Sequence, residues 1–264
     1  MSTPRRTVRP PDTQPVPFDD AASMAKKILR DKHRLEVPLG YLLIVEGTTD
    51  VAYLERAAAR VRDECDVDLL ALDDPDGRFS AITICTPLNP LADGNRGGTP
   101  QMIRLADDLH QHVMFFETVR PVCFVLDHDT EGRAAAKTIR ERHKYTSDFA
   151  RPITLDPKDH KNACHFCGKG ERAIVVEDLL SLDIQKTFFQ SGLRYCDVSY
   201  EAGKIVRFDW REPSKSELCE FVVTEASAED FREVARILVR VREMWRLDVP
   251  PSVTRFIDPH HAPE

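Results

Sequence analysis

Short apolar runs that end in acidic residues constrain the fold of this chain most strongly. The run YLLIV leads directly into Glu46, and the run VCFVL leads directly into Asp127. Each run is followed by a segment whose apolar residues recur at helical spacing, at 48–64 and at 130–145. Strands that alternate with helices predict a parallel α/β sheet with right-handed crossovers. Functional groups of such sheets gather at the carboxyl ends of the strands, so we expect both acidic positions to face one crevice.

The rest of the chain continues this alternation. Two more apolar runs, at 81–87 and 152–157, predict further strands, and apolar periodicity predicts further helices at 21–37 and 99–113. We therefore expect a Rossmann-like parallel sheet flanked by helices, followed by a helical C-terminal extension. The expected divisions are a disordered N-terminal arm at 1–20, an α/β domain with its preceding helix at 21–182, a C-terminal α/β extension at 183–250 and a tail at 251–264.

Composition narrows the class of protein. The 264 residues carry a net charge of −7, which is unlike a bulk nucleic-acid binder, although a metal site would itself add acidic residues. No apolar run reaches about 18 residues, so we expect no membrane span, and the N-terminus lacks the apolar core of a secretory signal. Most of the seven cysteines stand singly in apolar runs, as Cys85 and Cys123 do. This usage favours reduced, buried thiols in a cytoplasmic protein.

The acidic residues have the spacing of a metal site. Asp127 and Asp129 are two residues apart, so their side chains point the same way in an extended chain, and Gly132 permits a tight turn into the next helix. A third apolar run, AIVV, ends at Glu177. Mg²⁺ favours one or two carboxylates together with waters and a substrate phosphate. A structural role remains the alternative for each motif, because Asp and Glu also stabilise helix N-termini.

The sequences VEGTTD and DHDTEG, each placed after an apolar run, together resemble the Toprim domain. That domain is shared by topoisomerases, bacterial primases, recombination mediators and several nucleases. The resemblance covers residues 41–182, and the further sequence VVEDLL is similar to an extra acidic motif of OLD-family Toprim nucleases. The DxDxxG half is a weak signal alone and gains specificity from its pairing with VEGxxD.

The resemblance implies a nuclease site with two metal ions. It implies that Glu46 is a metal ligand or the general acid/base, and that Asp127 and Asp129 are catalytic metal ligands. Glu177 would be a further ligand, and Asp50 would help to hold the second ion. Two Mg²⁺ ions, or Mn²⁺ ions in their place, would activate an attacking water and stabilise the leaving oxygen in phosphodiester cleavage.

The chain departs from larger Toprim proteins in what surrounds these motifs. We find no tyrosine-bearing cleavage domain, no primase zinc-binding domain and no GxxxxGK[ST] phosphate loop. OLD-family nucleases carry a fused ATPase, so an ATPase that this chain needs would be a separate polypeptide. The expected partners are nucleic acid and such an ATPase subunit, and a homo-oligomer is left open.

A second, weaker metal candidate is a structural zinc site at His160, Cys164 and Cys167. A Cys-x-x-Cys pair with a nearby histidine suits Zn²⁺. No second half follows at standard spacing, so an exposed loop with reduced thiols is the alternative.

Basic residues follow the second acidic motif. Arg133, Lys137 and Arg140 recur at helical spacing, so they share a helix face that begins beside the site. They are candidates for contacts with a phosphate backbone, and a solvated face is an equal alternative. A downstream lysine completes some related nuclease sites; Lys204 and Lys215 lie in that region, and the sequence does not identify which lysine would do so.

Near the C-terminus, an apolar stripe predicts an amphipathic helix that packs on the core. Arginines line another face of this helix, and a nucleic-acid or partner surface is a less favoured reading of them. The stripe consists of Phe231, Val234, Leu238, Val241 and Trp245, and the arginines are Arg232, Arg236 and Arg240.

These features predict a Mg²⁺-dependent Toprim nuclease that hydrolyses phosphodiester bonds in DNA or RNA, in antiviral defence or DNA repair. The biological setting rests on family analogy. One alternative is a non-catalytic nucleic-acid-binding module of the recombination-mediator type. The third acidic motif argues against it, because a phosphate-binding module needs no cluster of carboxylates. Another alternative is a subunit that is active only in a complex.

Overall fold

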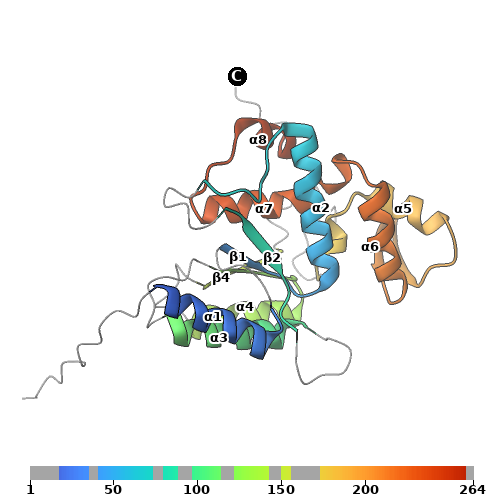
Figure 1. Cartoon of the computed structure of the whole chain (residues 1–264). Coiled ribbons are helices and arrows are strands. Elements are labelled where there is room, and N and C mark those ends of the chain that lie inside the picture. Colours follow the sequence, from blue (N-terminus) through green and yellow to red (C-terminus); the bar gives the residue numbers. More distant parts are fainter. Residues whose placement is uncertain are drawn as a thin grey trace, which may run out of the picture.

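The computed structural model describes residues 18–35, 41–73, 80–88, 97–113, 122–142, 150–155 and 173–259. Its centre is a parallel sheet in the order β2-β1-β3-β4, which confirms the predicted α/β class (Figure 1). The strands are β1 (Tyr41–Ile44), β2 (Ile82–Cys85), β3 (Val122–Leu126) and β4 (Ala150–Thr154).

The strand order places a topological switch point between β1 and β3. The chain passes from β1 to β2 on one side of β1 and then returns to β3 on its other side. The connections therefore leave β1 and β3 in opposite directions, and in open α/β sheets functional groups gather at the carboxyl ends of two such strands. Glu46 and Asp127 follow these two strands, so the fold brings the two acidic motifs to the same switch point.

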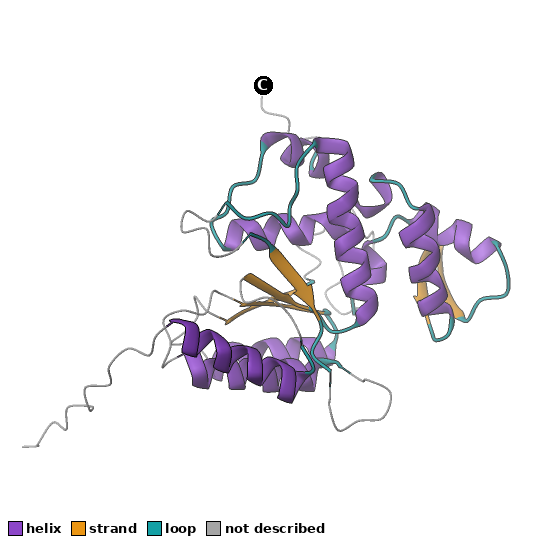
Figure 2. Cartoon of the chain, viewed as in Figure 1, coloured by secondary structure: helices purple, strands orange, loops and turns teal. Residues whose placement is uncertain are grey.

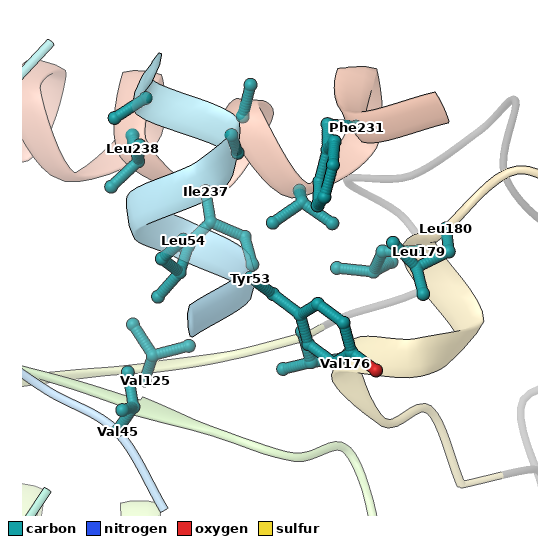
Figure 3. Packing of buried hydrophobic residues seen from close by; sticks show 14 of the residues in the cluster. Val45, Tyr53, Leu54, Val125, Val176, Leu179, Leu180, Phe231, Ile237 and Leu238 are labelled. Atoms are coloured by element: carbon teal, nitrogen blue, oxygen red, sulfur yellow. The ribbon is translucent and has the colours of Figure 1, made fainter. Parts of the chain in front are cut away.

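Helices cover both faces of the sheet (Figure 2). One face packs against α1 (Phe18–His33), α3 (Thr99–Val113) and α4 (Thr130–Arg142) through a core that includes Leu42, Ile44, Met102, Phe124 and Ile139. The other face packs against α2 (Thr48–Cys65) and α7 (Arg232–Met244) through a core that includes Leu43, Val45, Leu54, Val125 and Leu238 (Figure 3). Alternate residues of each strand enter the two cores, as expected for a strand buried on both sides.

The C-terminal part of the chain adds a second, smaller sheet that packs against α5, and α6 of this part packs against α2. This part contains η4 (Val176–Leu179), α5 (Leu182–Gln190), β5 (Cys196–Glu201), β6 (Lys204–Trp210), α6 (Ser214–Glu225), η5 (Glu229–Phe231) and α8 (Pro251–Ile257). Strands β5 and β6 form an antiparallel hairpin. The extension is continuous with the main core, because residues of α5, α6 and α7 belong to the same buried cluster as β1 and α2.

The helices nearest the two ends of the described chain differ from the prediction. Residues 251–257, expected as tail, form α8, and its Val253 and Ile257 are buried. Helix α1 begins at Phe18, within the expected arm, and residues 1–17 lie outside the described residues. Pro251 stands in the first turn of α8, where a missing amide hydrogen has no cost, so proline favours a helix start here.

The apolar stripe of α7 packs on the core as predicted. Phe231 of η5 and Val234, Leu238 and Val241 of α7 are fully buried, and Trp245, which follows α7, is partly buried against the same core. The arginines of the other face have internal partners. Arg236 pairs with Glu233 and also donates to the Ile257 carbonyl, Arg240 donates to the Thr154 carbonyl, and Arg232 pairs with Glu229.

The sequence predicted reduced, buried thiols and no membrane-spanning segment. The cysteines of the described segments are free thiols, and Cys85 and Cys123 are buried in the sheet. Burial raises the pKa of the Cys85 thiol to about 12. Within the described segments, none of the helices combines the length and the apolar character that crossing a membrane requires.

Arg242 of α7 connects the C-terminal extension to the main domain. Its Nη1 donates to the carbonyls of Leu69 and Ala71, at 2.9 and 2.8 Å, and its Nε donates to the carbonyl of Asp248 at 2.8 Å. We expect Arg242→Ala to lower the free energy of unfolding by about 3 kcal/mol, because three carbonyls lose a charged donor. Urea unfolding of the two proteins measures this.

Arg255→Ala is the matched control for this prediction. Arg255 is exposed, and its Nε makes one long hydrogen bond, of 3.3 Å, to the Pro251 carbonyl. It should change stability by less than about 0.5 kcal/mol. Equal losses in the two variants would contradict the proposed role of Arg242.

Candidate functional site

Glu46 extends from the end of β1 across the switch point. Its backbone carbonyl accepts hydrogen bonds from Thr86 Oγ1 at 3.0 Å and from the Gly98 amide at 3.1 Å. Its side chain then reaches β3, where Oε1 accepts a hydrogen bond of 2.9 Å from the Asp127 amide. The side chain of Glu46 thus joins the ends of the two neighbouring strands β1 and β3.

Two glycines allow the backbone to approach this place closely. A Cβ atom at Gly97 would lie 2.8 Å from the Pro87 carbonyl oxygen and 3.0 Å from the Glu46 carbonyl oxygen. A Cβ atom at Gly132 would lie only 2.1 Å from the Asp127 carbonyl oxygen. The turn from β3 into α4 therefore requires glycine, because any larger residue would collide with the backbone of Asp127.

Asp129 occupies the rim of the site and caps α4. Its Oδ1 accepts a hydrogen bond of 2.6 Å from the Gly132 amide. This bond satisfies one of the free amides at the helix N-terminus. Asp129 therefore stabilises a helix N-terminus, which is the structural role that the sequence left open for it.

The third acidic motif reaches the site through a short backbone pairing. The His128 amide donates to the Ile174 carbonyl at 2.8 Å, and the Ile174 amide donates to the His128 carbonyl at 3.4 Å. This pairing holds the segment before η4 against the turn that carries Asp127. Glu177 of η4 is consequently buried beside the site, with 2% of its surface exposed.

Lys215, in the first turn of α6, completes the cluster. Its Nζ lies 3.1 Å from Glu177 Oε1. Burial alone would lower the pKa of Lys215, but Glu177, Asp50 and Asp127 outweigh burial and raise it above its usual value. The sequence left the identity of the downstream lysine open between Lys204 and Lys215, and the structure brings Lys215 to the carboxylates.

Asp50 is buried in the first turn of α2. Its Oδ2 accepts a hydrogen bond of 2.9 Å from the amide of Gly47, the N-cap residue of α2, as in a capping box. Burial, and then the charge of Glu177, raise the pKa of Asp50 to about 6.

Burial also raises the pKa values of the two carboxyl groups at the switch point. The pKa of Glu46 rises to about 7, although the hydrogen bond from the Asp127 amide opposes this change. The pKa of Asp127 is well above its usual value, first because of burial and then because of the charges of Asp50 and Glu46. Carboxyl groups that share a low-dielectric site disfavour ionisation of one another.

Tyr53 of α2 lies behind these groups and is fully buried. Its ring packs in the main core, and its hydroxyl points toward Val176 of η4 (Figure 3). The hydroxyl lies beside the Cys219 thiol, a weak hydrogen-bonding group. Burial raises the pKa of Tyr53, and the charge of Glu177 adds to this effect. The apolar spacing of residues 48–64 gave no sign that Tyr53 would bring a hydroxyl group to this place.

The predicted site residues therefore divide into those that meet and those that do not. Glu46, Asp50, Asp127 and Glu177 share one electrostatic cluster with Lys215, and Asp129 lies at its rim. Arg133, Lys137 and Arg140 are exposed on α4. The candidate zinc residues His160, Cys164 and Cys167 lie outside the described residues.

The predicted basic face starts at the site and leads away from it. Arg133 donates to the His128 carbonyl at 3.3 Å, so it lies beside the turn that carries Asp127. Lys137 lies 3.8 Å from Glu141, and Arg140 donates to the Pro152 carbonyl at 3.3 Å. Arg133 is thus the basic residue of this face that is adjacent to the carboxylates.

The oxygen donors of the cluster are of the kind that bind a partly hydrated divalent cation. In the described part of the chain, no three His, Cys, Asp or Glu side chains converge closely enough to form a closed metal cage. Mg²⁺ needs no such cage, because one or two carboxylates and several waters hold it. The cluster contains four carboxyl groups and one ammonium group, and burial is the main cause of the raised pKa values of Glu46, Asp50 and Asp127. Glu46 and Asp127, on adjacent strand ends, are the groups best placed to hold a cation.

Replacement of Gly132 by alanine should disturb both the fold and the site. The new Cβ atom would push the Asp127 backbone away from α4, and we expect a loss of at least about 2 kcal/mol in the free energy of unfolding. Thermal unfolding measures the loss. Gly192→Ala is the control, because the nearest atoms to its Cβ belong to the flexible Arg194 side chain, at 3.5 Å or more. Similar melting temperatures of the two variants would contradict the close contact.

The raised pKa values predict a specific dependence of stability on pH. The folded state binds a proton at Glu46 more tightly than the unfolded state does, since the folded pKa is about 7 and the ordinary value is 4.5. The protonated Glu46 carboxyl group therefore contributes most to the free energy of unfolding below about pH 4.5, and this contribution is lost as pH rises through 7. We expect Glu46→Gln to raise the melting temperature by a few degrees near pH 8 in EDTA, and by less near pH 5.

The same reasoning predicts how added metal acts. Mg²⁺ should raise the melting temperature of the unmodified protein more near pH 8 than near pH 5, because protons compete with the cation. Glu220→Gln, a change at an exposed carboxylate of α6, should leave both effects intact. If the melting temperature depends on pH in the same way with and without Glu46, the prediction that folding raises the pKa of this carboxyl group is contradicted.

The comparisons of this chain with protein-family models, with curated proteins and with solved structures find no match.

Proposed function

We propose that this chain is a metal-dependent nuclease of the Toprim type, which hydrolyses phosphodiester bonds at the cluster of Glu46, Asp127 and Glu177. The observation that carries the proposal is the convergence of three separate acidic segments at the switch point of a parallel sheet. Helix capping accounts for Asp50 and Asp129. It does not account for Glu46, whose side chain crosses between strand ends, or for Glu177, which is buried against Lys215.

Glu46 has the properties of a general base. Its pKa of about 7 lies near neutral pH, where a carboxylate can accept a proton from water and release it again. The hydrogen bond from the Asp127 amide fixes the direction of its side chain. Divalent ions held here would supply Lewis-acid stabilisation of the phosphate and a more acidic water.

Lys215 reduces the repulsion between the cluster and a phosphate. Four carboxyl groups would repel a nucleic-acid backbone, and the ammonium group beside Glu177 offsets part of that repulsion. Arg133, at the rim, adds a second positive charge near the turn of Asp127. Lys215 belongs to α6 and Arg133 to α4, so a phosphate bound at the switch point would have a positively charged residue from each of these two helices nearby.

Asp127→Asn is the variant that tests the function. We would measure cleavage of supercoiled plasmid, single-stranded DNA and structured RNA with Mg²⁺, with Mn²⁺ and with EDTA. We expect cleavage that needs metal and falls at least about 100-fold in Asp127→Asn, because the amide binds cations poorly. Lys215→Met should reduce cleavage as well.

Asp209→Asn, a change at an exposed carboxylate of β6, is the control and should cleave as the unmodified protein does. Equal cleavage by Asp127→Asn would contradict the proposal and indicate a contaminating nuclease. Binding without cleavage, by folded protein on every substrate, would favour the binding module. In that case, purification with an ATPase partner would decide whether the site becomes active in a complex.

A further inference from the structure

Two of the exposed apolar side chains of the described chain lie in one short segment, between α5 and the hairpin. Leu193 is 96% exposed and Tyr195 is 64% exposed. Tyr200, at the other end of β5, is 61% exposed. Single exposed apolar residues are common, but a leucine and a tyrosine displayed within three residues form a surface that favours a partner.

The backbone of Tyr195 is fixed to the segment that carries Lys215. The Tyr195 amide donates to Ser214 Oγ at 2.9 Å, and its carbonyl accepts from the Arg211 amide at 2.9 Å. The Lys215 amide in turn donates to the Arg211 carbonyl at 3.0 Å. Three hydrogen bonds thus place the exposed tyrosine beside the first turn of α6, whose lysine contacts Glu177.

Aromatic packing makes this segment a rigid support. The Phe188 ring of α5 packs against Trp210 of β6, with ring centroids 5.3 Å apart. The guanidinium of Arg194 lies over the Phe188 ring, 4.1 Å from its centroid. Tyr195 is therefore held at its backbone while its ring stays in solvent, which lowers the entropy lost when a ligand stacks on it.

The charges of this surface favour stacking over phosphate binding. Arg194 pairs with Glu217 at 3.1 Å, and Arg211 pairs with Asp197. Both arginines are already neutralised, so the surface offers little to a duplex, which presents mainly its phosphates. A single strand also presents the faces of its bases, and an exposed tyrosine binds these faces without regard to sequence.

We propose that Tyr195, together with Leu193, stacks against an unpaired base of a single-stranded nucleic-acid substrate whose backbone continues to Lys215. This inference rests on the proposed function, because it assigns the substrate class of the same site. Single-stranded substrates are then preferred over duplexes, and their binding weakens only slightly as salt increases, since few phosphates are neutralised.

Fluorescence anisotropy with a labelled oligothymidylate tests the inference. Asp127→Asn would serve as the parent protein, so that the probe is not cleaved, and Tyr195→Ala, Tyr195→Phe and Tyr200→Ala would be added to it. We expect Tyr195→Ala to weaken binding about tenfold, whereas Tyr195→Phe keeps a stacking ring and changes Kd less than about twofold. Tyr200→Ala is the matched control, because Tyr200 is equally exposed and about 16 Å farther along the strand.

The outcomes separate this inference from the nuclease proposal. Equal loss of affinity in Tyr195→Ala and Tyr200→Ala, or no binding of the single strand by the parent, would overturn the stacking role. If the chain without the Asp127 change cleaves nucleic acid, Tyr195→Ala should raise KM for single strands and leave kcat nearly unchanged. Cleavage with an unaltered KM would retain the nuclease and reject the stacking role. Selective loss of binding in a chain that never cleaves would retain the stacking surface and reject the nuclease.

Discussion

The hydrogen bond between the Asp127 amide and Glu46 Oε1 is the contact on which the rest of the site depends. It joins the carboxyl ends of β1 and β3, the two strands between which the connections diverge. The Glu46 backbone is held from the opposite side by Thr86 and Gly98. The position of one carboxylate therefore depends on three strand ends, and the geometry of the switch point is determined by backbone groups more than by side-chain packing.

Around this contact the protein keeps negative charge where burial makes it costly. Glu46, Asp50 and Asp127 all have raised pKa values. In the described cluster, the ammonium group of Lys215 opposes this rise at Asp50 and Asp127. A domain selected only for stability would replace such groups by apolar or amide side chains of similar size. Perturbed carboxyl groups in a crevice are more common at functional sites than elsewhere, which is why the cluster supports a catalytic interpretation.

Much of the fold could be predicted from the sequence because its signals are local. Apolar runs such as VCFVL, followed by helical periodicity, identified β3 and α4, and alternation identified the parallel sheet. The choice of Lys215 could not be predicted, because it depends on how α6 packs against α2. The helix at 251–257 was missed because its seven residues contain too few apolar positions to show a period. For Asp129 the sequence left capping and metal binding open, since a capping aspartate and a metal-binding aspartate occupy the same place in the motif, and the structure shows the capping hydrogen bond.

The pairing of Glu177 with Lys215 has a consequence for the order in which the protein is made. Glu46 and Asp127 lie in the first half of the chain, whereas Lys215 lies near its C-terminal end, and Cys219 contacts the Thr49 carbonyl across 170 residues. Helix α7, which covers one face of the sheet, follows α6 in the chain, so the core of the sheet and the pairing of Glu177 with Lys215 are both completed only after the C-terminal part has been made. A chain that ended before α6 would carry the carboxylates of Glu46 and Asp127 without the ammonium group that offsets part of their negative charge.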